Sequence, residues 1–135
     1  MTGAGLGALC ACVAAGAVLA PAPTEQPDFF VRLNRAREAV SSGAGKAYFD
    51  GPFSRAFYEQ YPARLSYCVK TTGEDEPTGF DMLVQLAKNG RVESALVNPE
   101  SPVATCYRDL TKKDVFPPPP SAGLWVPVSI RFSVE

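Results

Sequence analysis

The sequence contains no histidine among its 135 residues. Histidine is the commonest general base and the commonest metal ligand in proteins. Its absence excludes histidine-dependent hydrolase mechanisms and histidine-ligated zinc. The chain also lacks the G-x-S-x-G nucleophile turn, the phosphate-binding loop, the dinucleotide glycine pattern and H-E-x-x-H. We therefore expect a protein that is not an enzyme and that uses no cofactor.

An excess of charge of either sign is absent as well. The formal net charge is −1, and the 13 basic residues are scattered along the chain rather than clustered. Nucleic-acid binding requires a concentrated basic surface, so no nucleic-acid partner is expected. Carboxylates cluster only at Glu74, Asp75 and Glu76, whose spacing is not that of a calcium-binding EF-hand loop. We expect no metal site there.

Charged side chains are missing from the first 24 residues, and the segment from Leu6 to Ala20 is an apolar run rich in Ala, Gly and Val. This pattern predicts that residues 1–22 are a signal peptide or, if they are retained, a membrane anchor. Leu9 and Ala11 precede Cys12 as in a lipidation site, which leaves lipidation of Cys12 as another interpretation, and a buried apolar helix as a fourth. Export to the periplasm or cell envelope follows, with membrane contact only through this segment.

The four cysteines fall into two groups. Cys10 and Cys12 lie in the apolar leader, whereas Cys68 and Cys106 lie in the remainder of the chain. An exported protein matures under oxidising conditions, so the second pair can form a structural disulfide. Two buried free thiols are the alternative. Neither cysteine has the C-x-x-C spacing typical of a redox or zinc site.

Residues 23–57 are predicted to be a polar linker followed by short N-terminal helices. From Pro27 onward, a helical face is shared by Phe29, Leu33, Ala36 and Val40. The arginines of this helix, Arg32, Arg35 and Arg37, are interpreted as a solvated face or as a contact with anionic lipid.

Further along the chain, apolar stripes predict one helical piece from Phe53 to Tyr61, before Pro62, and another from Ala63 to Thr71. Aromatic residues crowd these pieces and predict either core packing or an aromatic ligand groove. They are Tyr48, Phe49, Phe53, Phe57, Tyr58, Tyr61 and Tyr67.

A β-hairpin is predicted by two alternating segments, Phe80–Leu86 and Val92–Leu96, joined through Asn89-Gly90. Gly90 can occupy the left-handed position of a three-residue turn with a bulge. That turn places Leu86 opposite Val92 and Met82 opposite Leu96.

After the hairpin, Ser101 and Pro102 begin a helix as N-cap and first helical residue. One apolar face follows at Val103, Cys106, Tyr107 and Leu110. Four consecutive prolines, residues 117–120, end the helical region, and residues 126–134 then alternate cleanly as a last strand.

These elements predict an α+β fold: a three-stranded antiparallel sheet in the order 2-1-3, covered by a helix and preceded by short N-terminal helices. The helical crossover makes the last strand antiparallel to the first, beside which it can pair. Pro127 has no N–H and is tolerated at a sheet edge. The outward backbone groups of this edge then belong to Trp125, Ser129, Arg131 and Ser133.

The order of these features resembles the TonB C-terminal domain family, the periplasmic modules of bacterial energy transducers. The matching pieces are Tyr61-Pro62-Ala63, Gly79 before the first strand, the hairpin residues Lys88 to Val92, Ser101, Phe116-Pro117, and Ile130-Arg131-Phe132 in the last strand. The resemblance covers residues 58–134 and defines a predicted domain at 58–135. Cys68 and Cys106 take the positions of a cysteine pair found in a variant group of these domains.

The resemblance implies a non-enzymatic cell-envelope module with a role in transmembrane transport. Its partner would be an envelope protein segment or peptide that adds as a strand to the edge at Ser129, Arg131 and Ser133, with side-chain selectivity from Trp125 and Arg131. The same edge could pair with a second copy and give a homodimer. The alternative function is a structural envelope protein, or an inhibitor, acting through the aromatic N-terminal helices.

Overall fold

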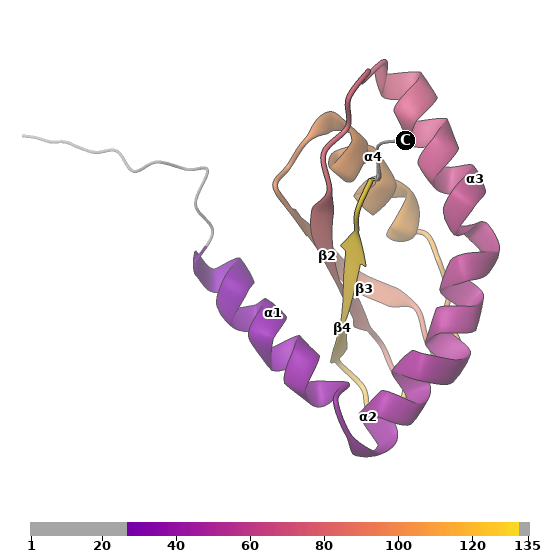
Figure 1. Cartoon of the computed structure of the whole chain (residues 1–135). Coiled ribbons are helices and arrows are strands. Elements are labelled where there is room, and N and C mark those ends of the chain that lie inside the picture. Colours follow the sequence, from indigo (N-terminus) through magenta and orange to yellow (C-terminus); the bar gives the residue numbers. More distant parts are fainter. Residues whose placement is uncertain (1–26, 133–135) are drawn as a thin grey trace, which may run out of the picture.

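The structure is a computed structural model that describes residues 27–132 (Figure 1). Its helices are α1 (Pro27–Ala39), α2 (Gly43–Tyr48), the π-helical turn η3 (Phe49–Phe53), α3 (Ser54–Thr72) and α4 (Pro102–Thr111). Its strands are β2 (Phe80–Leu86), β3 (Val92–Asn98) and β4 (Leu124–Ile130). The apolar leader with Cys10 and Cys12, and Ser133 at the other end, lie outside the described residues.

The three strands form one antiparallel sheet in the order β3-β2-β4. This confirms the predicted α+β class and the predicted order 2-1-3. Within residues 27–132, no helix combines the length and the apolar character that crossing a membrane requires.

Helices cover both faces of the sheet, which is thus the middle of three layers (Figure 1). On one face, alternate residues of β2 pack against α3 and α4; they are Phe80, Met82, Val84 and Leu86. On the other face, Leu83 packs against Phe29, Leu33 and Ala36 of α1. The sequence predicted the apolar face of α1 but not the sheet face that it covers.

One long helix replaces the two helical pieces expected on either side of Pro62. α3 has 19 residues and contains Pro62 in its interior. A proline inside a helix destabilises it by about 3 kcal/mol. Burial of Phe57 before it and Cys68 after it, both almost fully removed from solvent, offsets that loss. The predicted boundary after residue 57 falls inside this helix.

The hairpin turn is as predicted, but its register differs by one residue beyond the bulge. Gly90 has a φ of 91°, and Leu86 lies opposite Val92. Met82 then lies opposite Val97, because the bulge leaves Glu93 without a partner on β2. The expected pairing of Met82 with Leu96 is therefore wrong: Leu96 pairs with Leu83 and packs on the α1 side.

The helix after the hairpin begins as predicted, because the Ser101 side chain accepts a hydrogen bond of 3.2 Å from the backbone N–H of Ala104. Val103 and Tyr107 of α4 are fully buried against the sheet. A disulfide joins Cys106 of α4 to Cys68 of α3. The predicted pairing is confirmed, and it locks the two helices of this layer together.

Candidate functional site

The strand β4 forms one edge of the sheet and pairs with β2 without a bulge, from Leu86↔Leu124 to Phe80↔Ile130. Within the described residues, no strand lies on its other side. Pro127 lies opposite Leu83. Because proline has no N–H to donate to β2, it occupies a position whose backbone groups point away from β2. Trp125 and Ser129 lie two residues before and after Pro127, so their backbone N–H and C=O groups point away from β2 as well.

Side chains of the predicted edge residues are held by neighbours on β2. The Ser129 hydroxyl donates to Asp81 Oδ1 at 2.7 Å, and Arg131 Nη2 donates to the same oxygen at 3.2 Å. Arg131 Nη1 also donates to the Phe80 carbonyl at 3.1 Å. These bonds fix the end of β4 on β2. Ser133, the fourth predicted edge residue, lies outside the described residues.

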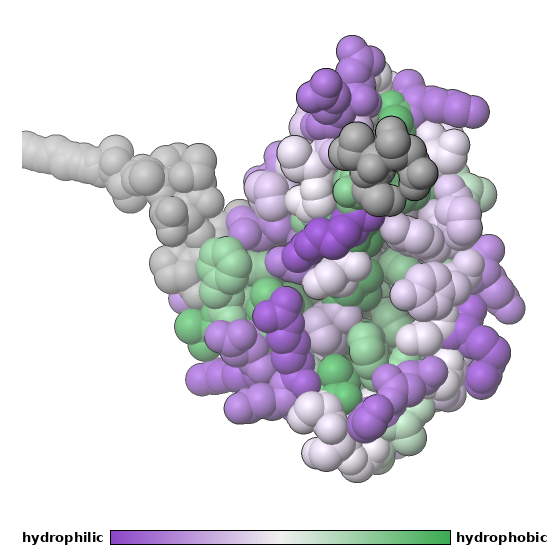
Figure 2. All heavy atoms as spheres, in the orientation of Figure 1, coloured by the Kyte–Doolittle hydropathy of each residue, from purple (hydrophilic) through white to green (hydrophobic). Residues whose placement is uncertain are grey.

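Two grooves flank this edge, one on each side of the sheet. α1 and α3 lie on either side of β4 (Figure 1), and Figure 2 shows hydrophobic residues in the hollow between the two helical ridges. The first, which we call the α1 groove, has a volume of about 500 Å³ and is lined by Asp28, Val31, Arg32, Arg35, Ala36, Ala39, Gly123, Leu124 and Trp125. The second, the aromatic groove, has a volume of about 440 Å³ and is lined by Phe49, Phe53, Ser54, Phe57, Tyr58, Tyr61, Pro127, Val128, Ser129 and Arg131.

The aromatic groove has a continuous wall of rings. Phe53 stacks between Phe49 and Phe57, with ring centroids 6.1 Å apart in both pairs, and Phe57 stacks on Tyr61 at 5.4 Å. Burial, together with the neighbouring Tyr58, raises the pKa of the Tyr61 phenol above its ordinary value. Tyr58 itself is 64% exposed. Phe53 and Phe57 thus pack in the core as predicted, while Phe49, Tyr58 and Tyr61 line the groove.

The α1 groove carries positive charge. Arg32 lies over the ring of Trp125, with its Cζ 4.6 Å from the ring centroid, and this cation–π contact orients both side chains. Within residues 27–132, neither Arg32 nor Arg35 makes an ion pair. Asp28 is the single carboxylate in the lining. The sequence was interpreted as placing these arginines on a solvated helix face or against anionic lipid, and this interpretation did not connect them with Trp125.

Comparison with family models, with curated proteins and with solved structures found no match. The resemblance to the TonB C-terminal domain family therefore stays a prediction from the sequence. Location in the periplasm and a role in transport likewise stay predictions. The site is interpreted below from its own geometry.

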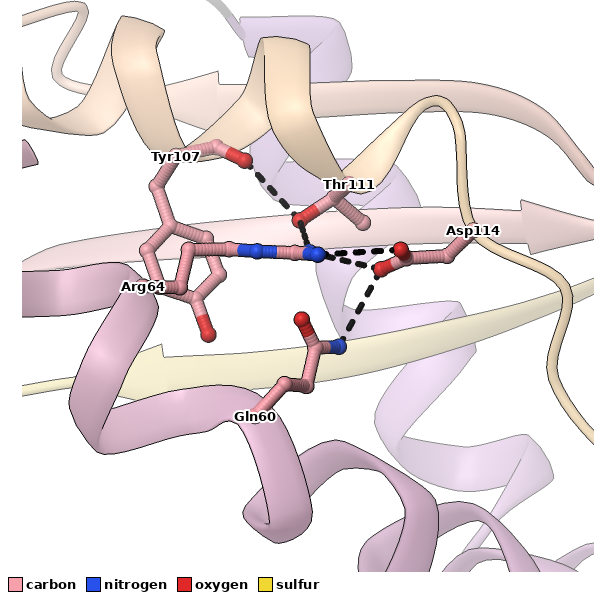
Figure 3. A network of polar contacts seen from close by, with 5 residues as sticks. All are labelled: Gln60, Arg64, Tyr107, Thr111 and Asp114. Carbon is pink, nitrogen blue, oxygen red and sulfur yellow. Dashed lines mark hydrogen bonds and ion pairs between the residues drawn. The ribbon is translucent and has the colours of Figure 1, made fainter. Parts of the chain in front are cut away.

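A second cluster of polar side chains joins α3 to the segment after α4 (Figure 3). Arg64 donates to both carboxylate oxygens of Asp114, at 2.6 and 3.0 Å, and Gln60 donates to Asp114 at 3.1 Å. Both ionic side chains are more than four-fifths buried. Such a bidentate, hydrogen-bonded pair holds its two segments in one geometry. Within the described residues, no group of His, Cys, Asp or Glu is arranged to hold a metal ion.

An alkaline limit to stability is expected from Tyr48, whose hydroxyl donates to the Pro117 carbonyl at 2.6 Å. Burial raises the pKa of Tyr48 to about 12, whereas a tyrosine in an unfolded chain ionises near a pKa of about 10. Between these values only the unfolded chain loses the proton. The free energy of unfolding should therefore be unaffected below pH 10 and fall as the pH rises from about 10 to 12.

Urea denaturation across this pH range tests the effect. Tyr48→Phe should make the alkaline decline shallower without removing it, because burial also raises the pKa of Tyr61 and of Tyr107. It should also lower stability at neutral pH by about 1 kcal/mol, the net value of one hydrogen bond. An unchanged alkaline slope in Tyr48→Phe would show that Tyr48 does not contribute to the fall in the free energy of unfolding.

Proposed function

We propose that this protein is a non-enzymatic binding module that captures an extended segment of a partner protein by strand addition to β4. The observation that carries the proposal is the outward backbone of Trp125 and Ser129, on either side of the buried Pro127, at an edge strand flanked by two grooves. In strand addition, main-chain hydrogen bonds supply affinity, and pockets for alternate side chains supply specificity. Here the outward edge of β4 would supply the first, and the grooves on either side of it would supply the second.

A single extended chain fits this edge better than a second folded copy. α1 and α3 stand on opposite faces of the sheet, and the grooves between them and β4 lie beside the edge. An antiparallel β4–β4 pair would continue the sheet about a twofold axis perpendicular to it, so each helix would meet its own symmetry mate over the edge. A peptide brings no such helices. This favours peptide capture over the homodimer.

The proposal places the protein in the periplasm or cell envelope, with an envelope protein segment as partner. The Cys68–Cys106 disulfide supports this placement, because disulfides persist in oxidising compartments. The apolar leader in the sequence supports it as well. The alternative, binding through the aromatic helices alone, has less support because Phe53 and Phe57 are buried in the core. Their exposed neighbour Tyr58 instead contributes to a wall of the β4 site.

Selection from a random peptide display library tests the proposal without assuming any partner sequence. The bait is the full chain, and binding is compared with Ser129→Pro, which removes an outward N–H and puts a proline ring on the edge. We expect selected peptides to lose on the order of 100-fold in affinity for Ser129→Pro.

Ser129→Ala is the matched control. It removes the hydroxyl bonded to Asp81 but keeps the backbone N–H, so binding should be retained. Thermal melts of both variants check that the fold is intact. If peptides bind Ser129→Pro as tightly as the unmodified chain, the β4 edge is not the binding site.

A further inference from the structure

The two grooves lie on opposite faces of the sheet and beside different segments of β4. The α1 groove adjoins residues 123–125, at the start of the strand, on the face to which Trp125 belongs. The aromatic groove adjoins residues 127–131, at its end, beneath η3 and α3. Successive side chains of an added strand point to opposite faces. One row of the partner's side chains therefore faces α1, and the other row faces the aromatic wall.

The walls differ in chemistry. Toward the aromatic groove, Phe49, Tyr58 and Tyr61 offer uncharged ring surface, with Phe53 and Phe57 buried behind them. The charged residue of this lining, Arg131, is paired with Asp81. Toward the α1 groove, Arg32 and Arg35 offer two guanidinium groups against the single carboxylate of Asp28. Guanidinium groups bind carboxylates bidentately and strongly.

We infer that the segment captured at β4 alternates apolar or aromatic side chains with acidic ones. This inference rests on the proposed strand addition. The apolar row fills the aromatic groove beside residues 127–131, and carboxylates of the other row pair with Arg32 and Arg35 beside Trp125. Charge complementarity thus selects the partner and sets its register along the strand.

The chain's own segments do not supply this pattern. In a second copy, the β4 residues on the same face as Trp125 would be Trp125, Pro127 and Ser129, none of which is a carboxylate. Residues 1–24 carry no charged side chain at all. The occupant that fits is a segment of another protein.

A pair of synthetic peptides of about nine residues, long enough to span β4, tests the inference. Both carry phenylalanine or isoleucine at every second position; one has glutamate at intervening positions and the other has lysine. Trp125 is the single tryptophan of the chain, so its fluorescence reports binding at this site. The full chain should bind the glutamate peptide about tenfold or more tightly than the lysine peptide, and added salt should reduce the difference.

Charge reversal of the groove provides the decisive comparison. Arg32→Glu with Arg35→Glu should invert the preference toward the lysine peptide. Arg37→Glu with Arg55→Glu is the matched control, since it changes the net charge equally at two exposed arginines outside both grooves. That control should keep the preference for glutamate.

The possible failures are distinguishable. If peptides bind at β4, and lose binding in Ser129→Pro, but glutamate and lysine peptides bind equally, the charge inference is wrong and strand addition stands. The inference is also overturned if neither synthetic peptide binds while library peptides do. A dimer in sedimentation that Ser129→Pro abolishes would place a second copy on the edge and overturn it as well. If no library peptide depends on the edge, the proposed function itself fails.

Discussion

Removal of the Cys68–Cys106 disulfide is expected to lower the free energy of unfolding by about 4 kcal/mol. The bond closes a loop with a sequence separation of 38, and loop closure of this length reduces the entropy of the unfolded chain by about that amount at room temperature. For a domain of this size, the melting temperature should fall on the order of 20 °C. Urea denaturation with and without reductant, monitored by circular dichroism, measures the loss.

Cys68→Ala with Cys106→Ala, measured without reductant, separates the bond from other effects of the reducing agent. The variant and the reduced protein should agree to within about 1 kcal/mol, because Cys68 is fully buried and alanine leaves only a small cavity there. A loss below about 1 kcal/mol on reduction would show that the bond does not constrain the unfolded chain.

Gly90→Ala is expected to destabilise the fold by about 3 kcal/mol or more. Gly90 has a φ of 91°, which L-residues rarely adopt, and an added Cβ would lie 1.8 Å from the Phe116 carbonyl oxygen. The backbone at Phe116 would have to move. That movement would break the 2.8 Å hydrogen bond from the Phe116 N–H to the Gly90 carbonyl and disturb the packing of Phe116 on Phe53.

Two other glycines separate the collision from the backbone strain. Gly73→Ala places a Cβ in open space at a φ of 69°, so it should lose only about 1 kcal/mol. Gly51→Ala has open space and no positive φ, so it should stay within about 0.5 kcal/mol of the unmodified protein. Thermal or urea unfolding ranks the three. Equal losses for Gly90→Ala and Gly73→Ala would contradict the close contact with Phe116.

The parts of the fold that the sequence predicted depend on local physics. The Ser101 N-cap, the left-handed Gly90 and the edge position of Pro127 follow from the conformations that these residues prefer. The strand order followed from the strand-helix-strand crossover, which makes the last strand antiparallel to the first.

The parts that it did not predict depend on tertiary contacts. The bulge at Glu93 moved Leu96 to the face under α1, where it pairs with Leu83 and packs against the apolar cluster that Leu83 forms with α1. Pro62 stays inside α3 because the burial of residues on both sides outweighs its local effect. Neither outcome can be obtained from residue preferences alone.

The sequence predicted the strand that forms the candidate site, but not the residues and grooves around that strand. The predicted crossover, together with Pro127, selected Trp125, Ser129 and Arg131 as edge residues, of which Trp125 and Ser129 lie within β4. Asp81, which holds Ser129 and Arg131, and Arg32, which lies over Trp125, come from elements far away in the chain. The grooves exist only after α1 and α3 have packed on opposite faces of the sheet.

Amide hydrogen exchange along β4 is the most direct measurement of strand addition. In the free protein, the amides of Val126, Val128 and Ile130, directed toward β2, should exchange slowly, and those of Trp125 and Ser129 should exchange rapidly. Saturation with a library peptide that requires the edge should slow Trp125 and Ser129 and leave the other three unchanged. Exchange at Trp125 and Ser129 that stays rapid in the complex, or that is already slow without peptide, would contradict a free edge that receives the partner's strand.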